Sequence, residues 1–323
     1  MYLEDVNITG FKSFSEKTEM SFQPGIGVII GNNGVGKSNI LDAIVWALGE
    51  DDLERVRCYE PGELFFAGSS AYPPADTIRV ELNFKSEDRR EAPVFRVTRE
   101  MDRRGTNRFA FQGEPVDRQD FHRHLADLGL GQALQTIIRQ ERINDILLAD
   151  PRTRLGMIRA TLGETAGENP GRCLREEVFP LFRRYMSYLM PLAEVRFDLG
   201  DGQRFDIETT LSGNRVRRAH QLSGGEKSVT SLALKIALFS RLQSPFYLLD
   251  EVEPALDYIN HKSMQAFLRD VADGKQLIMI THLRSTIDLA NTLHGVRTRF
   301  DGSSFMKFYF VMDERLLRLY KCC

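Results

Sequence analysis

A short stretch near the N-terminus, GNNGVGKS at 31–38, has the residue types and spacing of a loop that binds phosphate. It fits the pattern G-x-x-x-x-G-K-[ST], in which glycines let backbone N–H groups turn inward around phosphate oxygens. Lys37 would reach the β- and γ-phosphates, and the Ser38 hydroxyl would ligate Mg²⁺. The pattern therefore predicts a site for a nucleotide and Mg²⁺. The candidate binding residues are Asn33, Gly34, Gly36, Lys37 and Ser38, with Asn39 directly after them.

A second group of candidate residues follows an apolar run at 245–249. Asp250 comes at the end of this run, where the carboxylate of a strand can hold Mg²⁺ through water. Glu251 is one residue further on, where a carboxylate can act as the base that polarises an attacking water. Acidic pairs after apolar strands are common, but beside a complete phosphate loop this pair predicts hydrolysis of the bound nucleotide.

A third motif, LSGGEK at 222–227, precedes a predicted helix. Ser223, Gly224 and Gly225 would form the N-terminus of that helix, where free backbone N–H groups and the helix dipole favour an anion. A plain helix cap would explain the serine alone. Two phosphate-binding helix starts in one chain instead require a mechanism that uses both.

Short strands and helices in alternation would position these motifs. An apolar run at 26–30, bounded by glycines, predicts a buried strand directly before the phosphate loop. Apolar residues then recur at helical spacing up to Leu48, which predicts the helix that the loop opens. Further strands are expected at 77–84, 94–98 and 108–111. The expected fold is α/β, with a mainly parallel core sheet flanked by helices and an antiparallel β subdomain.

The composition narrows the class of protein. The 323 residues include 43 Lys and Arg and 45 Asp and Glu, and 42% of them are hydrophobic, so most of the chain should fold. The sequence contains no run of about 18 apolar residues, the length that a membrane-spanning helix needs, so no membrane span is predicted. The four cysteines form neither a disulfide framework nor a zinc-binding pair, since Cys322 and Cys323 are adjacent. A cytoplasmic protein without a membrane partner is expected.

Together these motifs resemble those of the ATP-binding cassette superfamily, in which LSGGE is the signature. Within that superfamily the sequence most resembles the head domain of the structural maintenance of chromosomes (SMC) ATPases, and the resemblance extends from residue 1 to about 310. Further segments carry it: GFKSF at 10–14, WALGE at 46–50, FFAGS at 65–69, DEVEPALD at 250–257, ITH at 280–282 and LHGV at 293–296. The resemblance implies an N-terminal lobe at 1–165, a linker at 166–173 and a C-terminal lobe at 174–323.

The resemblance also assigns roles by position. Gln140 corresponds to the glutamine that ligates Mg²⁺ and senses the γ-phosphate, and His282 to the histidine that bonds the γ-phosphate. Arg57 corresponds to an active-site arginine, and Asp257 to the aspartate that links two active sites. In this family the signature serine, here Ser223, completes the nucleotide site of a second head. The implied mechanism is ATP-dependent homodimerisation of heads, with Glu251 as the catalytic base.

The resemblance further implies duplex DNA as a partner, chromosome organisation or segregation as the function, and association with the nucleoid if the source is bacterial. A kleisin-type bridging subunit would bind the segment from 305 to 320. Arginine clusters at 152–159, 183–184 and 215–218 are candidates for contacts with DNA phosphates. The family's long coiled-coil arms and hinge are absent, because only about ten residues separate the two lobes.

Three alternatives remain open. A RecF-like DNA repair ATPase also has short arms, but the FFAGS and DEVEPALD segments favour the SMC type. An energy-coupling subunit of a membrane transporter has a shorter separation between the phosphate loop and the signature than that between Gly31 and Ser223. A clamp that binds ATP without hydrolysing it would not need Glu251 and His282.

Overall fold

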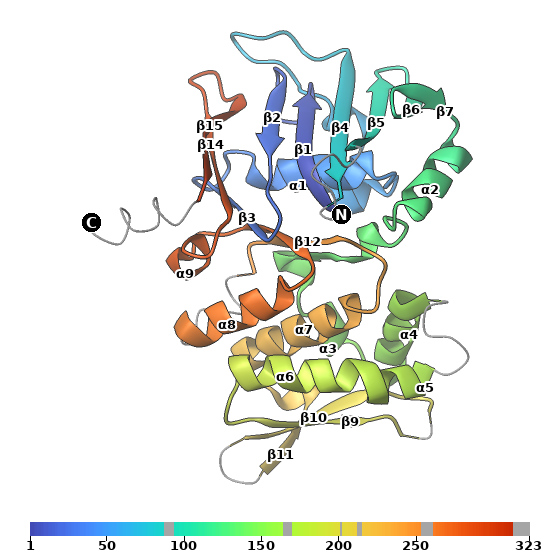
Figure 1. Cartoon of the computed structure of the whole chain (residues 1–323), viewed down its shortest axis with the longest axis vertical. Helices are drawn as coiled ribbons and strands as arrows, with labels where there is room; N and C mark the ends of the chain where they lie inside the picture. The colour runs from blue at the N-terminus through green and yellow to red at the C-terminus, as the bar shows by residue number, and fades with distance from the viewer. Residues whose placement is uncertain (87–93, 164–169, 201, 212–214, 253–260, 313–323) are drawn as a thin grey trace. The chain divides into compact units, whose positions relative to one another are not determined.

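The computed structural model describes residues 1–86, 94–163, 170–200, 202–211, 215–252 and 261–312 (Figure 1). The chain forms two compact units that interleave along the sequence. Unit 1 consists of Met1–Leu134, Gln243–Asp250 and Gly274–Cys323, and unit 2 of Gln135–Leu242 and Glu251–Asp273. The expected lobes at 1–165 and 174–323 divide the chain by sequence order, whereas each compact unit contains segments from both halves of the sequence. The division into lobes therefore stays a prediction.

Unit 1 contains an antiparallel sheet in the order β2-β1-β4-β5-β6-β7. The expected strands at 77–84, 94–98 and 108–111 all lie in it. Alternate residues of β4 are buried, as a sheet with one face on the core requires. The bounds of its strands are β1 Tyr2–Thr9, β2 Thr18–Ser21, β4 Thr77–Lys85, β5 Val94–Asp102, β6 Asn107–Phe111 and β7 Glu114–Val116.

The second sheet of unit 1 carries the phosphate loop and has the strand order β15-β14-β3-β13-β12 within this unit. Its inner strands β3, β13, β12 and β14 pair in parallel, and β15 joins β14 in antiparallel pairing. β12 and β13 are buried along their whole lengths, which is typical of a parallel sheet covered on both faces. The bounds are β3 Ile26–Ile30, β12 Phe246–Asp250, β13 Gln276–Ile280, β14 Thr292–Thr298 and β15 Ser304–Val311.

Helix α1, Lys37–Ala47, joins the two sheets of unit 1, since it follows β3 and packs against β1, β4 and β5 (Figure 1). The buried guanidinium of Arg99 on β5 lies 4.5 Å from the Trp46 ring and donates to the Trp46 and Glu50 carbonyls at 2.8 Å each. The first bond adds a partner to a carbonyl in the last turn of α1, and the second holds the segment that follows the helix. The other elements of the unit are η1 Leu53–Val56, η2 Pro61–Leu64, α2 Arg118–Asp127, η3 Ala133–Gln135 and α9 Arg284–Ile287.

Unit 2 is mainly helical and includes an antiparallel sheet in the order β11-β10-β9. Helix α6 packs against α7 and α8. The helices are η4 Gln140–Arg142, α3 Asp145–Leu148, α4 Pro151–Leu162, α5 Pro170–Cys173, η6 Leu174–Val178, α6 Phe179–Leu189, η7 Ala219–Gln221, α7 Gly224–Phe239 and α8 His261–Val271. The strands are β8 Ile137–Arg139, β9 Glu194–Asp198, β10 Asp206–Leu211 and β11 Arg215–Arg218.

A histidine lies in the apolar core of unit 1. His294 on β14 is fully buried, and its ring lies 4.5 Å from that of Phe22 and 5.0 Å from that of Tyr309. Burial lowers the pKa of His294 to about 3 and outweighs the opposing effect of the Ser21 backbone. The imidazole is therefore neutral in the folded chain at neutral pH.

This burial predicts a pH-dependent stability. Since the unfolded pKa is about 6.5, the unfolded chain takes up a proton below that pH, whereas the folded chain does not. The free energy of unfolding should fall by up to about 1.4 kcal/mol per pH unit as the pH drops from 6.5 towards 3. Urea unfolding at pH 7.5 and pH 5 measures this loss, and His294→Phe should reduce it. An equal loss in both proteins would contradict the assignment.

Candidate nucleotide-binding site

The phosphate loop connects β3 to α1 within unit 1. Gly34 and Gly36 both adopt left-handed backbone conformations, with φ of 79° and 95°. A Cβ on Gly36 would lie 2.4 Å from Ser304 Oγ and 2.5 Å from Ser13 Oγ, so only glycine fits there. Lys37 is almost fully buried, and its ammonium donates to the carbonyls of Gly31 and Asn32 at 2.9 and 3.0 Å. The loop thus curls around a single positive charge at the start of a helix.

The structure brings together two of the residues expected at the metal site. The Ser38 hydroxyl, in the first turn of α1, donates to Asp250 Oδ1 at 3.0 Å. Asp250 is the last residue of β12 and is 5% exposed. A hydroxyl and a carboxylate at this spacing offer the hard oxygen ligands that Mg²⁺ prefers, one directly and one through water. These residues fit a magnesium ion bound with the phosphates.

Arg57 lies in unit 1 beside α1. Its backbone is left-handed, with φ of 56°. The guanidinium Nη2 lies 2.6 Å from Asp42 Oδ2 and donates to Asn39 Oδ1 at 3.1 Å. Asp42 is completely buried on α1 and also pairs with Lys12, at 2.7 Å. No role was expected for Asp42 or Lys12 from the sequence, although Asp42 is the one charged residue between Lys37 and Glu50.

A chain of polar side chains continues from Asn39 to the phosphate loop. Asn39 Nδ2 donates to Ser13 Oγ at 2.8 Å, and Ser304 Oγ lies 2.7 Å from the same hydroxyl. Ser304 Oγ is also 2.8 Å from the Val35 carbonyl, inside the loop. No sequence pattern marked Ser304, because it is separated from the loop by most of the chain and meets it only after β14 and β15 have paired.

In unit 2, Gln140 begins the short helix η4 directly after β8 and is exposed. Three side chains on one face of α7 contact the segment that follows Gln140. Asn144 Nδ2 donates to Ser228 Oγ at 3.1 Å, Ser231 Oγ donates to the Ile143 carbonyl, and Lys235 Nζ donates to the Arg142 carbonyl. Burial lowers the pKa of Lys235 to about 8. The segment after Gln140 is therefore tied to the signature helix.

The signature motif forms the N-terminus of α7, as expected. Ser223 is the N-cap: its hydroxyl accepts from the Glu226 N–H at 3.4 Å, and Glu226 Oε2 accepts from the Ser223 N–H at 2.7 Å. Ser223 and Gly224 are both exposed, and no atom lies within 4 Å of a Cβ built on Gly224. Gly225 is half-buried. The helix start is therefore open to an approaching anion.

The remaining candidates have different positions. His282 is exposed and follows β13 by two residues, so it is not a core histidine. Glu251 directly follows β12 and has a left-handed backbone with φ of 47°, which is unusual for a non-glycine residue. Asp257 lies outside the described residues. Within the described ranges there is no helix long and apolar enough to span a membrane, and no cluster of three or more His, Cys, Asp or Glu residues that could hold a metal.

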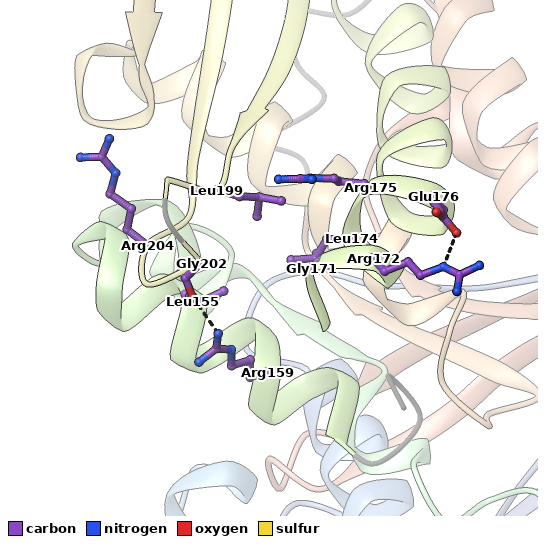
Figure 2. A pocket seen from close by; sticks show the side chains of 10 residues that line it. All are labelled: Leu155, Arg159, Gly171, Arg172, Leu174, Arg175, Glu176, Leu199, Gly202 and Arg204. Atoms are coloured by element: carbon purple, nitrogen blue, oxygen red, sulfur yellow. Dashed lines mark hydrogen bonds and ion pairs between the residues drawn. The ribbon is translucent and has the colours of Figure 1, made fainter. Parts of the chain in front are cut away.

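The arginines of the cluster at 152–159 differ in accessibility. Arg154 is buried and cannot contact DNA, contrary to the expectation: its guanidinium pairs with Asp206 at 2.6 Å and donates to backbone carbonyls. Arg159 is exposed and belongs to a pocket of about 410 Å³ in unit 2 (Figure 2). Arg159 donates to the Gly202 carbonyl at 2.9 Å, and Arg175 extends toward Leu199 in the same pocket (Figure 2).

The parallel sheet and the loop between β3 and α1 define a nucleotide-binding protein of the P-loop class. The model of the RecF/RecN/SMC N-terminal domain family matches residues 2–304, and the chain belongs to this family. The chromosome partition protein Smc of Mycolicibacterium paratuberculosis is 30% identical over 202 residues, which cover 62% of this chain and 17% of that protein. The alignment thus spans less than a fifth of the relative's length.

Solved structures of SMC heads have the same fold. An Smc head bound to the C-winged helix domain of ScpA has a TM-score of 0.85 and 27% identity, covering 98% of this chain and 100% of that chain. The SMC head domain from Thermotoga maritima has a TM-score of 0.70 and 32% identity, covering 97% and 100%. These similarities confirm the expected α/β fold and the resemblance to SMC heads.

Proposed function

We propose that this chain is an ATPase head that binds ATP with Mg²⁺ and acts in chromosome partition. The observation that carries the proposal is the contact between Ser38 and Asp250 beside a complete phosphate loop. The loop N–H groups and Lys37 would hold the β- and γ-phosphates. Magnesium, when bound, would neutralise charge on the transferring phosphoryl group, with Ser38, Asp250 and Gln140 as its protein ligands.

Hydrolysis would depend on residues that the resemblance assigns to the reaction. Glu251 would accept a proton from the attacking water. His282 would donate to the γ-phosphate, and the positive charge of Arg57 would stabilise negative charge on the phosphates. Gln140 would sense the γ-phosphate, and the segment that follows it, which contacts α7, would transmit the change to that helix. Asp257 would connect the two active sites of a dimer.

A second head would complete each nucleotide site. The open N-terminus of α7 supports this part of the proposal, because Ser223 and Gly224 face solvent and offer helix N–H groups to an anion. One chain would then carry two half-sites, and ATP would link two heads. Hydrolysis would release them.

The partners are proposed from the relatives and from exposed side chains. The relative with a TM-score of 0.85 is bound to ScpA, which supports a kleisin-type subunit as a partner of this chain. Strand β15 lies at the edge of its sheet, and the apolar side chains at its C-terminal end, Tyr309, Phe310 and Val311, are each partly exposed and available to such a partner. Exposed Arg159 and Arg175 are candidates for DNA phosphate contacts. The similarity to Smc proteins favours chromosome partition over RecF-like repair.

Replacement of Lys37 tests the nucleotide site. Lys37→Ala should lower ATP affinity by at least about 10²-fold, since it removes the charge inside the phosphate loop. Calorimetric titration with ATP and Mg²⁺ measures this loss, and circular dichroism checks the fold. Lys17→Ala is the control and should bind ATP normally, because Lys17 is an exposed lysine of the same unit that pairs with Glu19. Equal ATP affinity in all three proteins would exclude the proposed site.

A further inference from the structure

Two residues without an assigned role are connected to Arg57: Asp42 pairs with its guanidinium, and Lys12 pairs with Asp42. We propose that they are positioning residues: Asp42 fixes the guanidinium of Arg57, and Lys12 neutralises Asp42 so that the charge of Arg57 remains available to the nucleotide phosphates. This inference rests on the proposed function, because it concerns how Arg57 serves ATP turnover.

The geometry fixes Arg57 from two directions. Both Nε and Nη2 of Arg57 donate to Asp42 Oδ2, at 3.1 and 2.6 Å, so the planar guanidinium has a defined orientation. Lys12 Nζ contacts the same oxygen at 2.7 Å. It also donates to the carbonyl of Val56, the residue directly before Arg57. Lys12 therefore holds both the carboxylate that anchors the side chain and the backbone that leads into it.

The backbone conformations of Lys12 and Arg57 support the role proposed for Asp42. Lys12 and Arg57 are two of only four non-glycine residues with positive φ among those the structure describes, at 48° and 56°. A left-handed conformation is unfavourable for long side chains and persists only where surrounding contacts maintain it. Both of these residues bond to Asp42. One buried carboxylate thus contacts two residues that have unfavourable backbone conformations.

The charges explain why a second cation is present. Asp42 is completely buried, and with Arg57 alone it would form a neutral pair whose attraction for phosphate is weak. Lys12 is about one-tenth exposed, so it is shielded from solvent beside the same carboxylate, and it adds one positive charge. The three groups together carry a net charge of +1. Arg57 is the more exposed of the two cations, with 36% of its side chain accessible, so it is the one that can meet a ligand.

The link to the phosphate loop is continuous. Arg57 Nη2 donates to Asn39, and Asn39 reaches the Val35 carbonyl through Ser13 and Ser304. A displacement of Arg57 would therefore remove one end of a network that also contacts the loop. This predicts that loss of Lys12 affects turnover through Arg57 and not independently of it.

The test is a set of variants whose steady-state ATP turnover is measured as kcat and KM. Arg57→Ala should lower kcat by about 10²-fold with a small effect on KM, as for removal of one donor to developing charge. Lys12→Met should lower kcat by about 10-fold, and in the Arg57→Ala background it should cause no further loss.

The double variant Lys12→Met/Asp42→Asn restores the net charge of +1 and should recover part of kcat. Lys275→Met is the matched control, since Lys275 Nζ also donates to a carbonyl, that of Ser244; its kcat should be unchanged.

Equal losses from Lys12→Met with and without Arg57 would overturn the inference while leaving the proposed function intact. An unchanged kcat in Arg57→Ala would overturn it too, together with the role proposed for Arg57. If Lys12→Met does not fold, Asp42→Asn and the double variant decide the question. Asp42→Asn leaves two cations without their carboxylate and should be slow, and the double variant should be faster. No recovery in the double variant would overturn the inference.

Discussion

A Ser223→Arg protein is expected to bind ATP with unchanged affinity and to form no ATP-dependent dimer. Ser223 caps α7 and faces solvent, so it lies outside the phosphate loop of its own chain. A guanidinium there would block the helix start and fill the open space that a phosphate of the second head would occupy. Because both half-sites of a homodimer would be incomplete, turnover should fall by at least about 10²-fold.

Light scattering with and without ATP and Mg²⁺ measures this dimer, and calorimetry measures ATP affinity. Ser187→Arg is a matched control, because Ser187 is an exposed serine of α6 in the same unit. It should dimerise and hydrolyse ATP as the unmodified chain does. If Ser223→Arg retains both dimerisation and turnover, the signature serine does not complete a second nucleotide site.

Glu251→Gln should also lower ATP turnover strongly, but it should stabilise the ATP-dependent dimer, which Ser223→Arg abolishes. The amide cannot accept a proton from water, so turnover should fall by about 10²- to 10⁴-fold. Glu251 has nearly the size of glutamine, and its position directly after β12 is set by backbone geometry, so ATP binding should persist. ATP that is bound and not hydrolysed should hold two heads together.

Gel filtration with ATP and Mg²⁺ is expected to show a long-lived Glu251→Gln dimer that disperses when nucleotide is removed. Glu176→Gln replaces an exposed carboxylate of unit 2 that pairs with Arg172, and it should show ordinary turnover. A Glu251→Gln protein that stays monomeric with ATP bound would contradict the role of ATP as the link between heads.

The sequence predicted local features well because short-range patterns determine them. The buried strand at 26–30, the phosphate loop and α1 follow each other within one motif, and the strands at 77–84 and 94–98 are adjacent hairpin partners. The signature serine was also placed correctly at a helix start, since the capping residues are neighbours in sequence.

Features that depend on distant segments were not predictable in this way. Ser304 meets Ser13 and the Val35 carbonyl only because β14 lies beside β3 in the folded sheet. Arg154 appeared among the candidate DNA contacts, since an arginine that satisfies buried carbonyls looks the same in sequence as a solvated one. The interleaving of the two compact units likewise depends on long-range packing.

Steady-state ATP turnover per chain, measured as protein concentration rises and with or without linear duplex DNA, distinguishes heads that share nucleotide sites from a head that hydrolyses ATP alone. If two heads share their nucleotide sites, turnover per chain should increase with concentration until the dimer saturates, and DNA should increase it further. An increase with concentration alone would keep the shared sites and remove DNA stimulation from the account. Turnover per chain that is constant over a hundredfold or larger range of concentration, and absent from Lys37→Ala, would show that one head hydrolyses ATP alone and would contradict the account.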